Sequence, residues 1–164
     1  MALTTKRFAG AVLVASVVVL GAALLSQYWG GLTPCELCLL ERWPWWIAIA
    51  IAAPSWLTGD RLAPQIPAFL LAIVFLVGAG LGFYHVGVEQ HWFTGPTACT
   101  AGGAAATSVD ALRAQLLGKQ AVMCDEVQWS LFGVSMAGWN MIASAIMAAA
   151  CVEAARRSRR MRFA

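Results

Sequence analysis

Two cysteines at C-x-x-C spacing, Cys35 and Cys38, lie in the stretch PCELCLLERW at the edge of a long apolar segment. This spacing is typical of metal binding or of thiol–disulfide chemistry. A bridge across C-x-x-C closes a very small ring, so it restricts little of the unfolded chain and makes a poor structural brace. We therefore favour a pair that opens and closes during a reaction.

The neighbouring residues favour a reactive thiolate. Pro34 suits a helix start, which would place both cysteines in a first helical turn, where the helix dipole stabilises negative charge. Arg42 follows Cys38 by four residues, on the same helix face, so its fixed charge would favour a thiolate at Cys38 or bind a ligand's carbonyl oxygen. The alternative for Arg42 is a side chain that extends to the lipid headgroups. Glu41 is expected to hold Arg42 in place or to neutralise it.

Three further cysteines follow at positions 99, 124 and 151. We interpret Cys99 and Cys124 as a second pair, for which a structural disulfide that closes a loop is the alternative to exchange chemistry. No histidine lies at a zinc-finger spacing, so the chain does not predict a metal site. Cys151 is interpreted as a small packing residue.

The elements that position these cysteines are predicted to be membrane helices. The chain of 164 residues is 60% hydrophobic and only 12% charged, which is too apolar for an ordinary soluble domain. A single all-α membrane domain over residues 1–164 is expected, a bundle of four transmembrane helices. The expected spans are 8–28, 35–53, 67–88 and 130–152. The first span is too long for the apolar core of a signal peptide, the alternative for that segment.

Basic residues predict the orientation of these spans. Most of the 11 lie at the two termini and in the loop between the second and third spans, namely Lys6, Arg7, Arg61, Arg156, Arg157, Arg159, Arg160 and Arg162. Both termini are therefore expected in the cytoplasm, and the basic C-terminal tail is interpreted as an anchor at anionic lipid rather than a nucleic-acid site. Cys35, Cys38, Cys99 and Cys124 then lie outside, where disulfides persist.

The long outer loop, roughly 89–129, has two expected parts. The Gly- and Pro-rich stretch TGPTACTAGG should expose Cys99. Residues 107–118 place apolar side chains on one helical stripe, which predicts a short helix lying on the membrane. His85 and His91 bracket the outer end of the third span. We interpret both as structural, with contact to a cofactor by either histidine, or by Glu41, as the secondary hypothesis.

The second and third spans carry features of packing. Pro44 removes a backbone hydrogen bond and is expected to bend the second span near its outer end. Gly78 and Gly82 form a small-xxx-small pair that allows close helix approach. The aromatic belt of a membrane interface accounts for three tryptophans, Trp43, Trp45 and Trp46.

Three stretches, PCELCLLER, GPTACT and CDEVQWSLFGVSMAGW, resemble the DsbB family of inner-membrane disulfide-generating proteins. The resemblance covers essentially the whole chain. It implies a multi-pass protein of the bacterial inner membrane that reoxidises a periplasmic thioredoxin-fold oxidant of the DsbA type and passes the electrons to membrane quinone.

The resemblance also implies a role for each cysteine. Cys99 would be attacked by the thiolate of the DsbA-type partner, and Cys124 would be paired with Cys99. Cys35 and Cys38 would reoxidise that pair. Cys38 would form the adduct or charge-transfer complex with the quinone, which we expect to be ubiquinone rather than menaquinone, and Arg42 would lie against it.

Two alternatives stay open. One is a relay for a dedicated partner, or a relay like those of VKOR proteins, although VKOR proteins place the quinone-side C-x-x-C late in the chain and this chain places it early. The other is a membrane scaffold with two structural disulfides and no catalysis.

Overall fold

The computed structural model describes residues 5–59, 63, 65–96 and 123–160. Three of its helices are long and apolar enough to cross a membrane. They are α1 (Thr5–Tyr28), α4 (Gln65–Glu89) and α7 (Met136–Arg160), and the bounds of α1 and α4 lie within a few residues of the first and third predicted spans. The protein is therefore a multi-pass membrane protein.

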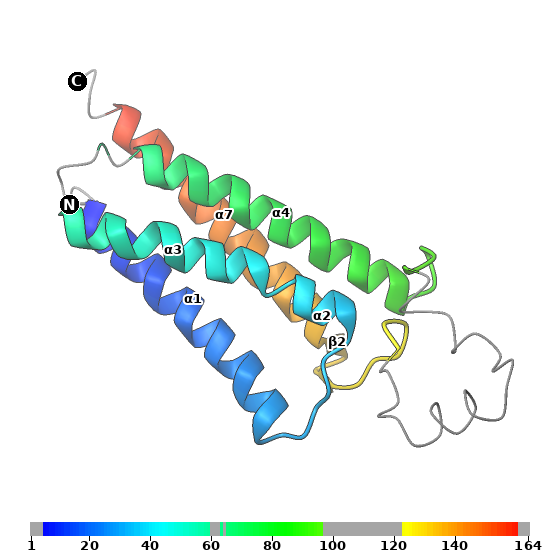
Figure 1. The fold of residues 1–164 in the computed structure, drawn as a ribbon. Coiled ribbons are helices and arrows are strands. Elements are labelled where there is room, and N and C mark those ends of the chain that lie inside the picture. Colours follow the sequence, from blue (N-terminus) through cyan, green and yellow to red (C-terminus); the bar gives the residue numbers. More distant parts are fainter. Residues whose placement is uncertain (1–4, 60–62, 64, 97–122, 161–164) are drawn as a thin grey trace, which may run out of the picture.

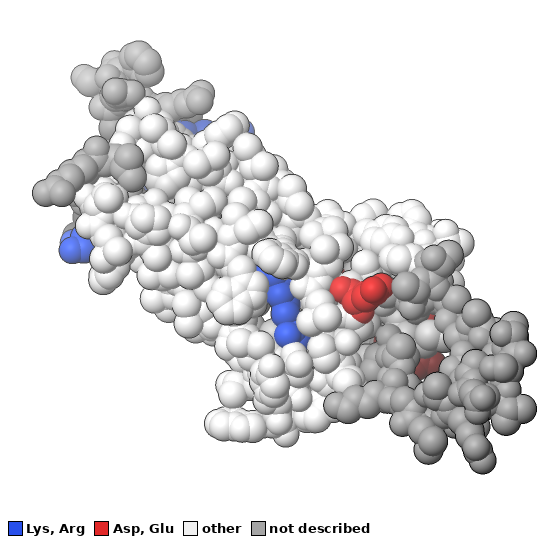
Figure 2. Space-filling view, in the orientation of Figure 1, with Lys and Arg blue, Asp and Glu red and all other residues white. Residues whose placement is uncertain are grey.

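The helices run side by side as an elongated bundle (Figure 1). α7 packs chiefly on α4, α4 also packs on α3 (Trp43–Thr58), and α3 packs on α1. The start of α1 and the end of α7 lie at one end of the bundle, whereas the short helix α2 (Glu36–Leu40) lies at the other (Figure 1). Figure 2 shows one face that is almost free of charged side chains along most of its length, as a lipid-facing surface requires.

The second span differs from its prediction. In place of one helix over 35–53, α2 ends at Leu40 and α3 begins at Trp43, so the expected bend at Pro44 is a complete break. Pro44 has no N–H to donate to the turn before it, and its ring would clash with the carbonyl four residues earlier. It is tolerated in the first turn of a new helix, where it lies in α3.

The predicted end of this span at residue 53 is also wrong, because α3 continues through Pro54 to Thr58. The hydroxyl of Ser55 donates a hydrogen bond to the Ile51 carbonyl at 2.7 Å, and the hydroxyl of Thr58 donates to the Pro54 carbonyl at 2.9 Å. Pro54 has no N–H for the Ala50 carbonyl four residues earlier, and these two hydroxyl groups bind neighbouring carbonyls in the same part of α3.

The fourth span begins six residues later than predicted. Residues 130–135 form a small antiparallel hairpin, β1 (Ser130–Leu131) and β2 (Val134–Ser135), and the helix starts at Met136. Phe132 and Gly133 make the two-residue turn with positive φ angles of 53° and 77°, as tight hairpin turns require. The Ser135 hydroxyl then accepts a hydrogen bond from the Gly138 N–H at 3.1 Å and caps α7.

The core of the bundle contains Trp45, which was predicted to lie at the membrane interface, and Cys151, which was predicted to be a packing residue. Trp45 is only 2% exposed and packs edge-on against Phe75, with ring centroids 5.1 Å apart, so it belongs to the core and not to an interfacial belt. Trp43 and Trp46 are exposed, as a belt requires. Cys151 is a buried free cysteine within this core, which confirms its interpretation as a packing residue.

α4 and α7 approach each other closely at the glycines predicted to allow it. A Cβ atom added at Gly82 would lie 2.9 Å from the Cα of Met141, and one at Gly78 would lie 3.1 Å from the Ser144 hydroxyl. At Gly80, on another face of α4, the same atom would meet nothing within 4 Å. Gly82 is therefore the position where the backbones limit side-chain size.

Gly82→Ala is expected to lower the stability of the bundle by about 1–3 kcal/mol, because an extra methyl must push α4 away from the backbone of α7. Thermal unfolding in detergent micelles, followed by circular dichroism, measures the loss as a Tm lower by several degrees. Gly80→Ala is the matched control, since it makes the same change on the same helix in open space. Equal Tm values for the two variants would contradict the close packing at Gly82.

Candidate functional site

Cys35 and Cys38 form a disulfide at the start of α2, with their Cα atoms 5.0 Å apart. Cys35 is the N-cap residue of this helix, and its sulfur accepts a hydrogen bond from the Cys38 N–H at 3.1 Å. The predicted helix start after Pro34 is therefore confirmed, with one refinement. The backbone N–H that the first turn offers is aimed at the Cys35 sulfur, so this hydrogen bond favours a thiolate at Cys35.

A buried histidine from another helix faces the same sulfur. His85 of α4 is 3% exposed, and its Nε2 lies 3.6 Å from the Cys35 Sγ. Its Nδ1 lies 2.7 Å from Oε1 of Glu41, which occupies the turn between α2 and α3 and is 7% exposed. The carboxylate thus holds the imidazole in an orientation that directs its second nitrogen at the disulfide.

Two more side chains fix Glu41. Its second oxygen, Oε2, accepts a hydrogen bond from the Asn140 amide of α7 at 2.7 Å. The Asn140 carbonyl oxygen accepts in turn from the indole N–H of Trp45 at 2.7 Å. Because both carboxylate oxygens are bound, a network that joins α3, α4 and α7 sets the position of Glu41.

Arg42 points elsewhere. Its Nη1 donates a hydrogen bond to Oε1 of Gln27 in α1 at 2.7 Å. The expectation that Glu41 holds or neutralises Arg42 is wrong, because Glu41 is paired with His85. Residues adjacent in a helical turn point in different directions, so neighbours in sequence do not meet there.

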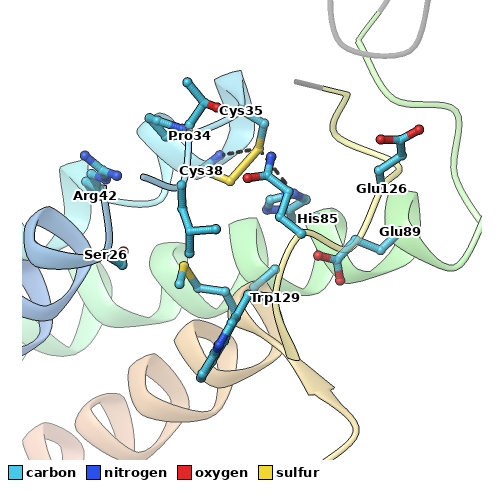
Figure 3. Close-up of a pocket in the computed structure, with 14 residues that line it drawn as sticks. Ser26, Pro34, Cys35, Cys38, Arg42, His85, Glu89, Glu126 and Trp129 are labelled. Atoms are coloured by element: carbon cyan, nitrogen blue, oxygen red, sulfur yellow. Dashed lines mark hydrogen bonds between the residues drawn. A yellow bond between two sulfur atoms is a disulfide. The ribbon is translucent and has the colours of Figure 1, made fainter. Parts of the chain in front are cut away.

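A cavity of about 50 Å³ lies beside the disulfide. Cys38, Arg42 and His85 line it, together with side chains from α1 and from the segment before α7. Figure 3 shows Arg42 on one side of the disulfide and Glu89 and Glu126 on the other. Trp129, also a lining residue, lies below the disulfide in this view (Figure 3).

The third cysteine of the described site is Cys124, which is disulfide-bonded and 1% exposed. It belongs to the same buried cluster as Cys35, together with Leu37 and Val88, and Cys38 packs against this cluster. Its predicted partner, Cys99, lies outside the described residues, as does the predicted interfacial helix over 107–118. The pairing of Cys124 with Cys99 therefore stays a prediction.

The two predicted histidines occupy different environments. His85 lies at the disulfide, whereas His91 is exposed in the turn after α4, and its Nδ1 lies 3.2 Å from the Glu89 carbonyl oxygen. Within the described residues, the lining of the cavity includes His85 and not His91. Sequence reasoning missed Asn140 and Gln27 altogether, because single amides in long helices carry no spacing signal.

The disulfide lies at one end of an apolar helix bundle, and the His85–Glu41 pair contacts one of its sulfurs. These features define a membrane protein whose class of chemistry is thiol–disulfide exchange. A family model described as "Disulfide bond formation protein DsbB" matches residues 5–154. The chain belongs to this family, which confirms the resemblance stated from the sequence.

Two curated relatives are similar to this chain, both described as "Disulfide bond formation protein B". The protein from Herminiimonas arsenicoxydans is 32% identical over 81 residues, which is 49% of this chain and 51% of the relative. The protein from Chromohalobacter salexigens is 29% identical over 140 residues, or 79% of this chain and 78% of the relative. The first match thus spans about half the length of that relative. No solved structure matches the chain significantly.

Proposed function

We propose that this protein is a thiol:quinone oxidoreductase of the bacterial inner membrane. It takes electron pairs from a soluble thioredoxin-fold dithiol protein of the DsbA type and passes them to membrane quinone. The observation that carries this proposal is the placement of Cys124 in one buried cluster with Cys35, while Cys38 lines a cavity beside Arg42. The family is quinone-dependent in general, which supports the acceptor.

The topology of four crossings belongs to the same proposal. α3 has 16 residues, about 24 Å of helix, and is short for a bilayer core of about 30 Å. We therefore assign α2 and α3 together to the second crossing. Supporting this, the start of α1 and the end of α7 lie at one end of the bundle (Figure 1), and these two segments carry Lys6, Arg7, Arg156 and Arg157. That end is assigned to the cytoplasm and the disulfide end to the periplasm.

The proposed route begins at a disulfide between Cys99 and Cys124. A thiolate of the reduced partner attacks Cys99, which forms a mixed disulfide and releases Cys124 as a thiolate. Cys124 then attacks the buried sulfur of Cys35, and the bond to Cys38 breaks. Each step forms one S–S bond and breaks one, and the electron pair arrives on the Cys38 thiolate at the cavity.

The route then closes. The second thiol of the partner resolves the mixed disulfide, so the partner leaves oxidised and Cys99 is free. Cys99 attacks Cys124, which restores the loop disulfide and releases Cys35. Cys35 and Cys38 are now a dithiol that carries the two electrons. When quinone binds, it supplies the acceptor for these two electrons and two protons, and the starting disulfide is restored.

His85 and Glu41 are assigned to the Cys35 sulfur in this proposal. Nε2 of His85, 3.6 Å from Cys35 Sγ, is placed to hold the proton of the Cys35 thiol and to return it. Glu41 holds the ring through Nδ1, 2.7 Å away, and stabilises it when it is charged. For His85 and Glu41, these roles at the Cys35 sulfur take the place of the earlier secondary hypothesis, which was direct contact with the quinone. His91 has no role in the proposed route.

Cys38 and Arg42 are the residues that would hold the quinone. A cavity of about 150 Å³ encloses a benzene molecule, so the 50 Å³ cavity here does not enclose a quinone ring. The ring would instead lie against the mouth of this cavity, where the Arg42 guanidinium can donate to a carbonyl oxygen. Ubiquinone stays the favoured acceptor over menaquinone.

The test of this proposal is an assay with the purified protein in detergent. A reduced thioredoxin-fold dithiol protein and a soluble ubiquinone analogue are added, and the loss of quinone absorbance is followed, with a menaquinone analogue compared in parallel. Catalytic quinone reduction that depends on the dithiol protein is expected. A scaffold with two structural disulfides would give no turnover, and that result would reject the proposal.

Arg42→Ala is expected to raise the KM for quinone by about 10- to 100-fold, because a hydrogen bond from a charged group contributes about 1.5–3 kcal/mol. Steady-state rates at varied quinone concentration measure it, with kcat at saturating quinone changed less. Arg157→Ala is the control, since Arg157 is exposed at the far end of α7 and forms an ion pair with Glu153 one turn away. If both variants keep the original KM, Arg42 does not bind the quinone.

A further inference from the structure

The disulfide and its histidine form a set of three potential metal ligands. The sulfurs of Cys35 and Cys38 and a ring nitrogen of His85 all lie within 4.8 Å of one another. The two sulfurs come from one C-x-x-C segment, whereas the histidine comes from a different helix 50 residues further along than Cys35. In the disulfide state the sulfurs are bonded to each other, so only the reduced pair can bind an ion.

We propose that the reduced form of this site binds one thiophilic divalent cation, such as Zn²⁺ or Cd²⁺, through Cys35, Cys38 and His85. The bound ion would hold both thiolates and so prevent their return to the disulfide. Binding would therefore depend on the redox state of the protein. This inference does not rest on the proposed function, because a chemical reductant can open the disulfide without any partner protein or quinone.

The distances fit such an ion. Zinc binds thiolate sulfur at about 2.3 Å and imidazole nitrogen at about 2.0 Å, so tetrahedral ligands stand about 3.5–3.8 Å apart. Nε2 of His85 already lies 3.6 Å from the Cys35 sulfur. The C-x-x-C spacing is the one that commonly supplies two thiolates to a single zinc ion. After reduction the Cys38 sulfur can move away from the Cys35 sulfur, because Cys38 lines the cavity of about 50 Å³.

The surroundings of His85 also fit a ligand. A histidine that binds metal almost always donates its other ring N–H to a carboxylate or a carbonyl, which fixes the ring and increases its basicity. Here Nδ1 lies 2.7 Å from Oε1 of the buried Glu41, which leaves Nε2 directed at the sulfurs. Both oxygens of Glu41 are bound, one by His85 and one by Asn140, so the carboxylate supports the ring and is not itself a ligand.

Charge and coordination number are consistent with a divalent ion. Two thiolates and one neutral imidazole around a 2+ ion sum to zero, which lowers the cost of placing the charges in a buried site. Three protein ligands leave a fourth position open, and a cavity of about 50 Å³ can hold a water molecule there. An ion bound in this way is open to exchange, unlike the closed four-ligand zinc sites of structural domains.

The experiment uses the full chain in detergent micelles, reduced with a phosphine, freed of reductant and titrated with Cd²⁺. Each cysteine's rate of alkylation is read by mass spectrometry of its own peptide, which separates Cys35 and Cys38 from the other cysteines. Cd²⁺ is expected to slow alkylation of these two cysteines by roughly tenfold or more. The thiolate is both the nucleophile and the metal ligand, so a thiolate bound to Cd²⁺ is not available to the alkylating reagent. The ultraviolet absorption of Cd²⁺–thiolate bonds should appear in parallel, and a chelator should reverse both effects.

Two variants and a control test the ligand set. His85→Ala removes a ligand and Glu41→Gln removes its carboxylate support, so each should weaken Cd²⁺ protection of Cys35 and Cys38 by roughly 10- to 100-fold. His91→Ala is the matched control, because His91 is exposed and does not line the cavity. Zn²⁺ bound to the reduced wild-type chain should give an X-ray absorption spectrum with sulfur and imidazole ligands.

Three results would overturn the inference. The first is unprotected Cys35 and Cys38 in the reduced wild-type chain at saturating Cd²⁺. The second is equal protection of Cys35 and Cys38 from alkylation in wild-type and His85→Ala chains, which would show that Cd²⁺ binds the two thiolates without His85 as a ligand. The third is a zinc spectrum with sulfur ligands and no imidazole, a wild-type measurement that holds even if the His85 variant fails to fold. A chain that binds Cd²⁺ but does not reduce quinone would reject the proposed function and leave this inference standing.

Discussion

Cys38→Ala is expected to abolish catalytic quinone reduction, with a loss of at least about 10³-fold, because Cys35 is then the one cysteine of the pair left at the cavity and cannot close a disulfide while two electrons pass to the quinone. The loop cysteines would still be present, so a reduced thioredoxin-fold partner should be oxidised once and then no further. The predicted result is a single equivalent of partner oxidised per chain, with no quinone consumed. Rapid-quench alkylation of the partner and quinone absorbance measure the two quantities in one experiment.

The matched control is Cys151→Ala, which removes the buried free cysteine of α7 in the bundle core. It should lower stability slightly and leave turnover intact, because no step of the proposed route uses that sulfur. Continued turnover by Cys38→Ala would show that electrons leave from another cysteine. Absence of even the first equivalent would show instead that the partner cannot use the loop pair alone.

The disulfide of the C-x-x-C pair and the helix start beside it could be predicted from the sequence because they are encoded over short distances. The C-x-x-C spacing, the proline before it and the arginine one turn after Cys38 lie within ten residues, and a helix start relates their positions directly. The apolar lengths of α1 and α4 were likewise sufficient to predict these helices. The close approach at Gly82 followed from spacing too, since small residues four apart share one helix face.

The mispredicted parts depend on contacts between segments that are distant in sequence, or on whether a short apolar stretch folds as a hairpin or as a helix. Nothing near Glu41 in the sequence shows that its partners come from α4 and α7, so pairing it with the adjacent Arg42 was the only local option. Trp45 looks identical to Trp43 and Trp46 in sequence, and only the packing of α3 against α4 buries it. The start of the fourth span was missed because the apolar LFGV stretch counts as hydrophobic whether it is hairpin or helix.

The buried histidine and its carboxylate lead to the second large effect. His85→Ala is expected to lower kcat by about 10²-fold or more, the size of effect that a positioned proton donor or acceptor contributes. Glu41→Gln should have a comparable effect, because a glutamine amide cannot accept from both His85 and Asn140 as the carboxylate does. The KM for quinone should change little in both variants, since these residues serve the Cys35 sulfur, whereas Arg42→Ala should mainly raise that KM. Steady-state kinetics with varied quinone separates the two patterns.

Stability has to be measured beside activity, because breaking a buried pair by removing one partner can cost about 3–5 kcal/mol. Glu41→Gln keeps the size of the side chain, and its Tm in micelles shows whether the bundle survives. Glu153→Gln is the matched change at an exposed carboxylate of α7, whose ion pair with Arg157 should contribute less than about 1 kcal/mol. A folded Glu41→Gln chain with normal kcat would mean that the network only supports the fold. A raised quinone KM at unchanged kcat in His85→Ala would instead move His85 from the sulfur to the quinone.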